Sequence, residues 1–184
     1  MNYINLTNNL YMEKMNGLNE SHLELAKELD KDECICGENG YLWSIEKNLS
    51  CSLYVDGKYL NNGNIYQSPY VIYHNEIPIG YMEISKIYED IKAVALAYAL
   101  LNIYRGKGYA YLTLKSIAEK ILLDKVDDVQ RVMLHIDVTN IKSQNVALRA
   151  GFADDGLSLN EYEAQGYIGY QKTRGMLIQE KHFM

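Results

Sequence analysis

A short glycine-rich turn is the part of this sequence whose residue types and spacing could do chemistry. It reads Tyr104-Arg105-Gly106-Lys107-Gly108-Tyr109-Ala110. If a helix begins behind this turn, its first backbone N–H groups lack intrahelical partners and carry the positive end of the helix dipole, which favours phosphate. Glycines let a ligand approach the backbone closely, and the arginine and lysine add positive charge. The turn therefore predicts a phosphate or pyrophosphate site, although an ordinary strand-to-helix turn without a ligand reads the same way.

The flanking sequence places this turn between a strand and a helix. Residues 93–101 form an uninterrupted apolar run, which is typical of a buried strand. Residues 111–124 follow the turn and repeat apolar side chains at helical spacing, namely Leu114, Ile117, Ala118, Ile121 and Leu122.

Two other phosphate-binding patterns do not fit the turn. A Walker P-loop needs Gly-Lys-Ser/Thr, but Gly108 is followed by Tyr109. A dinucleotide fingerprint needs a third glycine where Tyr111 stands, which disfavours an NAD-binding oxidoreductase. The pattern that fits is Arg-x-x-Gly-x-Ala, which begins at Arg105 and ends at Ala110.

The rest of the chain predicts an α+β protein. One strand is expected within residues 3–15, and further strands are expected in a hairpin of residues 69–73 and 77–84 and at residues 131–138 and 167–173. Helices are expected from residue 19 to about residue 30 and over residues 143–150, the latter ended by Gly151. Residues 87–90 read as a connector. Residues 31–69 read as irregular, with a short helix near Leu42 and Trp43, and are the expected place for a substrate-binding loop.

Composition limits the class of protein. A length of 184 residues suits one domain over residues 1–184, and a formal net charge of -6 argues against nucleic-acid binding while suiting a cationic substrate. No apolar run approaches the ~20 residues of a membrane span, and no signal peptide is recognisable, so a cytoplasmic location is expected. The three cysteines, Cys34, Cys36 and Cys51, read as free thiols, and no metal site is predicted.

A second motif lies downstream and supports the first. It consists of Asn140, Ser143 and the pair Gly151-Phe152. Together, the two motifs resemble those of the GCN5-related N-acetyltransferase (GNAT) superfamily, closest to its ribosomal-protein-alanine N-acetyltransferase branch. The resemblance covers residues 77–152. It implies a central mixed, mostly antiparallel sheet of about six to seven strands flanked by helices.

The resemblance also implies that the chain uses acetyl-coenzyme A (acetyl-CoA) and no metal. The cosubstrate would lie where the parallel strands 93–101 and 131–138 splay apart. Asn140 would reach the pantetheine or the sulfur, although it also suits a helix cap, and both can hold. Pantetheine would bond to backbone near Leu100 and Leu101, and pyrophosphate would rest on the turn formed by Arg105, Gly106, Lys107, Gly108, Tyr109, Ala110 and Tyr111.

The implied reaction is direct attack of a substrate amine on the thioester. Glu83 is the first candidate for the base, unless it faces solvent on its strand. For the general acid, many family members use a tyrosine seven residues after the asparagine, but this chain has Ala147 there. Ser143 could donate to sulfur, or could simply belong to the first turn of its helix. Tyr98 could point to the acetyl group, or could belong to the core.

The acceptor stays open at this level. The resemblance allows a small amine, such as a polyamine or aminoglycoside, or a protein N-terminus. It also leaves room for a homodimer. The sequence identifies neither the general base nor the general acid unambiguously. The alternative function is therefore a non-catalytic acyl-CoA sensor with the same fold.

Overall fold

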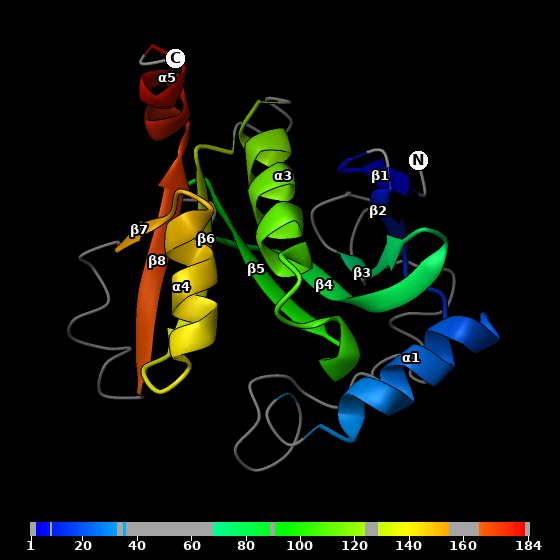
Figure 1. Ribbon diagram of the computed structural model, residues 1–184. Coiled ribbons are helices and arrows are strands. Elements are labelled where there is room, and N and C mark those ends of the chain that lie inside the picture. The colour runs from blue at the N-terminus through cyan, green and yellow to red at the C-terminus, as the bar shows by residue number, and fades with distance from the viewer. Residues whose placement is uncertain are drawn as a thin grey trace. The chain divides into compact units, whose positions relative to one another are not determined.

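The computed structural model describes residues 3–7, 9–32, 35, 68–88, 91–123, 129–154 and 166–182 (Figure 1). In these residues, one eight-stranded sheet has the order β1-β2-β3-β4-β5-β6-β8-β7. Its strands are β1 (Tyr3–Asn5), β2 (Leu10–Lys14), β3 (Ser68–His74), β4 (Ile77–Tyr88), β5 (Ala93–Leu100), β6 (Arg131–Asp137), β7 (Ala153–Asp154) and β8 (Tyr167–Thr173). The helices are α1 (Glu20–Asp30), α3 (Tyr109–Leu123), α4 (Ile141–Arg149), α5 (Arg174–His182) and the 3-10 helix η2 (Asn102–Tyr104). The predicted α+β class with a mixed, mostly antiparallel sheet is confirmed.

The sheet has more strands than predicted for two local reasons. Residues 3–15 form β1 and β2, which pair antiparallel with Tyr3 opposite Glu13, where one strand was predicted. The strand β7 has two residues, too few for any periodicity to show. The predicted connector at residues 87–90 is wrong in its first half, because β4 continues to Tyr88. The short helix predicted near Leu42 and Trp43 lies outside the described residues.

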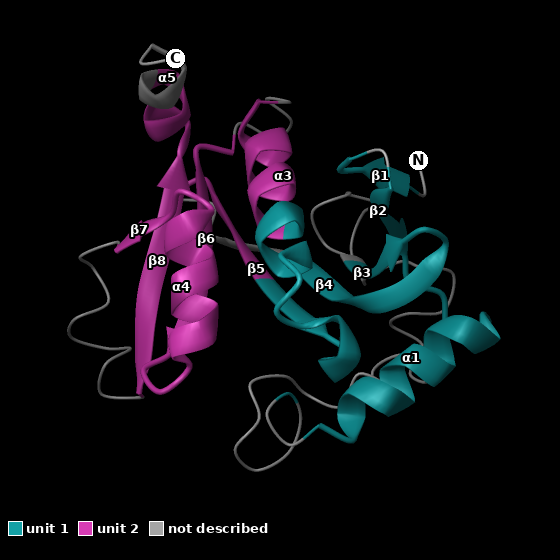
Figure 2. Cartoon of the chain, viewed as in Figure 1, with its two compact units in different colours: residues 1–85, 97–113 teal, residues 86–96, 114–184 magenta. Residues whose placement is uncertain are grey.

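The chain divides into two compact units (Figure 2). Unit 1 comprises residues 1–85 and 97–113, and unit 2 comprises residues 86–96 and 114–184. The single domain expected over residues 1–184 stays a prediction.

In unit 1, α1 covers one face of the strands. The helix begins where its sequence indicates, because the side chain of Asn19 caps it by accepting a hydrogen bond from the N–H of Ser21 at 3.0 Å. β2 pairs antiparallel with β3, and β3 with β4. The apolar side of α1 packs into a core cluster of Met15, Leu25, Ala26, Leu29, Ile35, Val71, Tyr73, Tyr81 and Ala99. This cluster defines the α1 face of the strands.

In unit 2, β6 has a different partner on each side. It runs parallel to β5, from Ala93 opposite Arg131 to Ala95 opposite Met133, as the resemblance implied, and antiparallel to the whole of β8.

Lys172 on β8 is 1% exposed, and its Nζ donates to the carbonyl of Ala150 at 2.9 Å. The carboxylate of Glu119 on α3 lies 3.5 Å from the same Nζ. A buried ammonium group therefore joins three elements of this unit.

Across the described ranges, no helix combines the length and apolar character needed to cross a membrane.

Candidate functional site

The glycine turn lies at the predicted junction. The chain leaves β5 at Leu100, passes through η2 and returns to begin α3 at Tyr109 (Figure 1). Gly106 and Gly108 have φ values of +74° and +85°, in the left-handed region that glycine adopts without strain. A Cβ atom built on either glycine would meet no described atom within 4 Å. The backbone of the turn is therefore open to a ligand.

The backbone hydrogen bonds of this segment leave donors ahead of the helix. The N–H of Tyr104 bonds to the carbonyl of Leu101 at 2.9 Å, within η2. The hydrogen-bond ladder of α3 begins with the N–H of Leu112, which bonds to the carbonyl of Gly108 at 3.0 Å. The N–H groups of Gly108, Tyr109 and Ala110 precede that ladder, so the start of α3 fits a pyrophosphate.

The two cations of the turn have different surroundings. Arg105 folds back, so that its Nε donates to the carbonyl of Leu100 at 2.9 Å and its Nη2 donates to the carboxylate of Asp32 at 2.6 Å. Lys107 is exposed, and its Nζ lies 5.4 Å from the centroid of the Tyr104 ring. Asp32 was not singled out in the sequence, because 73 positions separate it from Arg105 and no local pattern joins them.

At the end of β5, one backbone N–H already has a hydrogen-bond partner on β4. The N–H of Leu101 donates to the carbonyl of Ile79 on β4 at 3.0 Å. Because successive N–H groups of a strand point to opposite sides, the N–H of Leu100 points away from β4. Of the two residues predicted to bond pantetheine, Leu100 is therefore the one whose N–H does not face β4.

Gly80 on β4 is a positioning residue that the sequence analysis missed. A Cβ atom at this position would lie 2.4 Å from the carbonyl oxygen of Ala99 and 2.5 Å from the Cδ2 atom of Leu100. Only glycine lets β4 approach the end of β5 this closely. A glycine inside a strand pattern is the signal that could have found it, since such glycines often mark close backbone approach.

The candidate base Glu83 has a buried neighbour on its own strand. The hydroxyl of Tyr81, which is 3% exposed, donates to the Oε2 atom of Glu83 at 2.8 Å. Residues two apart on a strand share a face, so Glu83 lies on the α1 face with Tyr81. Ala99 also belongs to that face, which puts Tyr98 on the opposite one. The structure thus brings Glu83 together with Tyr81 and not with Tyr98.

In unit 2, Asn140 caps α4. Its Oδ1 accepts a hydrogen bond from the N–H of Ser143 at 3.1 Å, which is the capping role that the sequence left open. The cap uses the side-chain oxygen alone, so the amide Nδ2 can still serve as a donor elsewhere. Ser143 is the third residue of this helix and lies in its first turn.

Two histidines of unit 1 contact aromatic side chains. The ring centroids of His74 and Tyr109, the first residue of α3, are 4.5 Å apart. His22 is fully buried on α1. Its Nδ1 accepts the N–H of Asn16 at 3.0 Å, and its Nε2 lies 2.9 Å from the hydroxyl of Tyr73.

The buried histidine belongs to a network of titratable groups. Because Nδ1 accepts a hydrogen bond from the backbone, Nε2 carries the proton of the neutral ring and donates to Tyr73. Burial lowers the pKa of the His22 imidazole and raises the pKa of the Tyr73 phenol. Burial also raises the pKa of Glu13, whose carboxylate lies 3.9 Å from His22. These groups join β2, β3 and α1, and they stabilise the core beside the sheet.

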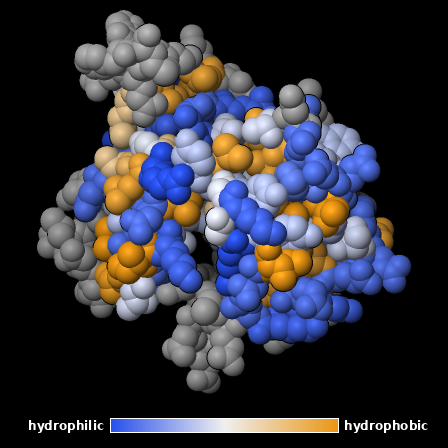
Figure 3. All heavy atoms as spheres, viewed as in Figure 1, coloured by the Kyte–Doolittle hydropathy of each residue, from blue (hydrophilic) through white to orange (hydrophobic). Residues whose placement is uncertain are grey.

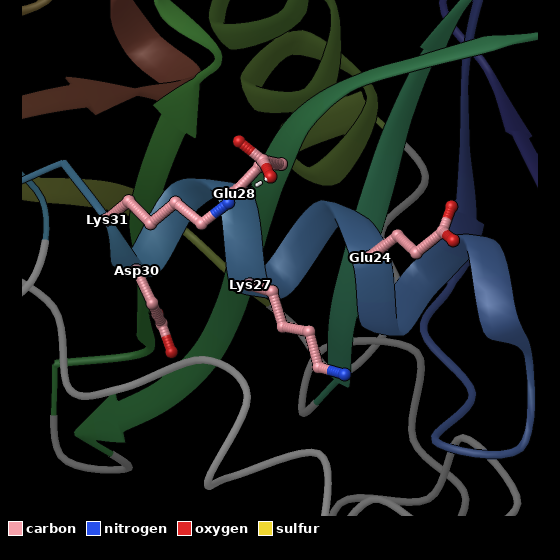
Figure 4. A pocket seen from close by; sticks show the side chains of 5 residues that line it. All are labelled: Glu24, Lys27, Glu28, Asp30 and Lys31. Carbon is pink, nitrogen blue, oxygen red and sulfur yellow. Dashed lines mark hydrogen bonds and ion pairs between the residues drawn. The ribbon is translucent and has the colours of Figure 1, made fainter.

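A separate hollow lies on the outer face of α1 (Figure 4). Its lining carries both signs of charge, and Figure 4 shows Lys31 paired with Glu28. Over α1 the surface is mostly hydrophilic (Figure 3). The lining residues are Glu24, Lys27, Glu28, Asp30 and Lys31, none of which belongs to the glycine turn. Within the described residues, no group of three or more His, Cys, Asp or Glu side chains could hold a metal ion.

Comparison with protein families decides the membership of the chain. The model of the acetyltransferase (GNAT) domain matches residues 38–153, which are 116 of the 184 residues. The chain belongs to the GNAT acetyltransferase family. No curated protein matches it at a significant level.

Solved structures of several acetyltransferases share the fold at low identity. The ribosomal L7/L12 alpha-N-protein acetyltransferase RimL, in complex with coenzyme A, is 21% identical with a TM-score of 0.69, over 93% of this chain and 97% of that one. The microcin C7 self-immunity acetyltransferase MccE, in complex with acetyl-CoA and AMP, is 17% identical with a TM-score of 0.68, over 92% and 95%. A chimera of the spermidine N-acetyltransferase SpeG from Vibrio cholerae is 15% identical with a TM-score of 0.67, over 91% and 96%.

Proposed function

We propose that this protein transfers the acetyl group of acetyl-CoA to a primary amine, by direct attack of the amine on the thioester. The proposal rests above all on the turn between β5 and α3, where two glycines with positive φ leave the backbone open before a helix start. Family membership and two similar structures solved with coenzyme A or acetyl-CoA support the same cosubstrate.

Unit 1 would supply most contacts to the cosubstrate. The pyrophosphate would rest on the N–H groups between Gly106 and Tyr111, with Lys107 adding positive charge. The pantetheine arm would bond to backbone at Leu100, as an added strand does. The side-chain amide of Asn140 would serve the pantetheine or the sulfur. No metal takes part in this reaction scheme.

The reaction removes two protons from the substrate nitrogen and supplies one to the departing sulfur. Glu83, oriented by the hydroxyl of Tyr81, would accept a proton from the substrate ammonium group, directly or through water. The neutral amine then attacks the thioester carbon, and the C–S bond breaks. The nitrogen of the intermediate would lose its second proton to solvent as the amide forms. The departing thiolate would accept a hydrogen bond from the hydroxyl of Ser143 and take its proton from solvent, a modest requirement because a thiol pKa is near 8.5. Tyr98 stays a weaker candidate, since it lies on the other face of the strands from Glu83.

The acceptor is a cationic or N-terminal amine. The net charge of -6 suits a cationic substrate. The similar structures include a ribosomal-protein alpha-N-acetyltransferase and a chimera of a spermidine N-acetyltransferase, so the fold alone accommodates both classes of acceptor. A polyamine, an aminoglycoside and a protein N-terminus therefore form the test panel. A homodimer is the proposed assembly.

Two measurements test the proposal. Calorimetry should show binding of acetyl-CoA and none of NADH; the reverse result would rule out the assignment. Release of free thiol should then appear with at least one amine of the panel. Glu83→Gln should abolish release while acetyl-CoA still binds, and Glu28→Gln, the same change on the outer face of α1, should leave release intact. Binding of acetyl-CoA without thiol release for any amine would favour the alternative function of an acyl-CoA sensor.

A further inference from the structure

A side-chain bridge joins the end of α1 to the glycine turn. Asp32 follows α1 and accepts a hydrogen bond from Nη2 of Arg105 at 2.6 Å, while Nε of the same guanidinium donates to the carbonyl of Leu100 at 2.9 Å. We propose that Asp32 is a positioning residue for coenzyme binding, which acts by holding Arg105 across the base of the turn. This inference rests on the proposed function and adds a residue that the family motif does not contain.

The carboxylate comes from a fixed segment of unit 1. The N–H of Asp32 bonds to the carbonyl of Leu29 at 3.1 Å, and its carbonyl accepts the N–H of Ile35 at 2.8 Å. Leu29 and Ile35 are both buried in the core cluster beneath α1. Asp32 is therefore tied to the core on both sides, and it presents its side chain from a defined place.

The guanidinium in turn fixes the start of the glycine turn. Arg105 is held at three points, because its backbone N–H also bonds to the carbonyl of Asn102 at 3.1 Å. The next residues include Gly106 and Gly108, which have the greatest backbone freedom to lose on ordering. Fixing the residue before them lowers the entropy lost when a ligand orders the turn, and this preorganisation strengthens binding.

The alternative role for Arg105, as a direct phosphate ligand, predicts the opposite sign. In that case Asp32 would neutralise the cation and add a negative charge near the phosphates, so that removing Asp32 would tighten binding. The Asp32 and Arg105 side chains are 23% and 36% exposed, so solvent screens their mutual attraction. The geometry points to orientation, and not to net charge, as the contribution of the pair.

Calorimetry with coenzyme A itself tests this inference. Asp32→Asn keeps the shape but leaves only a neutral acceptor for Nη2, which holds Arg105 less firmly; it should weaken binding roughly threefold to tenfold, as expected when a charge-assisted hydrogen bond becomes a neutral one. Arg105→Lys keeps the charge but cannot reach both partners, so it should weaken binding to a similar degree. The double variant should bind no more weakly than the weaker single variant, because both changes break the same bridge.

The matched control is Glu28→Gln, which makes the same change in net charge on α1, close to Asp32 in the sequence, and removes an exposed ion pair with Lys31. Its affinity for coenzyme A should stay at the wild-type value. Equal or tighter binding by Asp32→Asn, or additive losses in the double variant, would overturn the positioning role. If Asp32 served stability alone, Asp32→Asn would have a lower melting temperature than wild type, and the folded variant would bind coenzyme A with unchanged affinity. Failure of the wild-type protein to bind coenzyme A would instead reject the proposed function.

Discussion

Replacing Gly80 by alanine is the sharpest test of how β4 positions the end of β5. The new methyl group would lie 2.4 Å from the carbonyl oxygen of Ala99 and 3.1 Å from the Cα atom of Leu100. Both atoms belong to the backbone, so no side-chain rotation relieves the contact. The strands must separate at this point.

The loss in free energy of unfolding follows from how far the two strands must separate. Bringing the Cβ–oxygen distance from 2.4 Å to the 3.0 Å lower limit of real contacts requires a shift of about 0.6 Å. The hydrogen bond from Leu101 to Ile79, at 3.0 Å, would then stretch to about 3.6 Å and be lost. Overpacking costs about 1–3 kcal/mol, and the lost bond about 0.5–1.5 kcal/mol. We expect a total of about 2–4 kcal/mol.

Thermal unfolding measures this loss. For a chain of this size each kcal/mol corresponds to about 2–4 °C, so the melting temperature should fall by roughly 5–15 °C. Affinity for coenzyme A should fall as well, because Leu100 leads into the glycine turn. The matched control is Gly175→Ala on α5, where the nearest atom to the new Cβ lies 3.8 Å away and alanine favours the helix.

The reasoning would be refuted by a Gly80→Ala protein that melts within about 2 °C of the wild type, like the Gly175 control. That result would mean that β4 and β5 separate without cost, and that the close approach at Gly80 does not position the glycine turn.

Three further predictions follow from the contacts described above. Lys172→Met should cost about 1–3 kcal/mol in denaturant unfolding, because the carbonyl of Ala150 loses its buried donor; an unchanged midpoint would contradict this role. Burial lowers the pKa of His22, so its contribution to stability is present above about pH 6.5 and is lost as the pH falls through that value and below. The urea midpoint of wild type should therefore fall faster below that pH than the midpoint of His22→Gln, and parallel curves would reject the assignment. Tyr81→Phe should lower kcat roughly fivefold without changing acetyl-CoA affinity, because Glu83 loses one hydrogen bond; a loss of affinity instead would argue against orientation of the base.

The glycine turn and the capping positions of α1 and α4 could be predicted because their causes are local. Positive φ at Gly108 and the caps at Asn19 and Asn140 depend on residues within four positions of each other. The position of α3 after β5 follows from periodicity alone. Two predicted helix starts are wrong by two residues, because α3 begins at Tyr109 and not at residue 111, and α4 begins at Ile141 and not at residue 143.

The candidate base shows where sequence reasoning stopped. Alternation along β4 predicts that Glu83 shares a face with Tyr81, but not whether that face meets α1 or solvent. Packing of α1 on Tyr81 and Ala99 decides it. The same packing puts Tyr98 on the other side of the strands.

The sequence by itself determined the family, the class of fold and the place of the glycine turn, because motifs and periodicity are properties of neighbouring residues. Only the tertiary structure decided that Arg105 bonds to Asp32 and that Gly80 meets the end of β5. The first contact spans 73 positions and the second joins separate strands, so no periodicity records either. They exist because burial of the α1 core and pairing of the strands bring distant segments of unit 1 together.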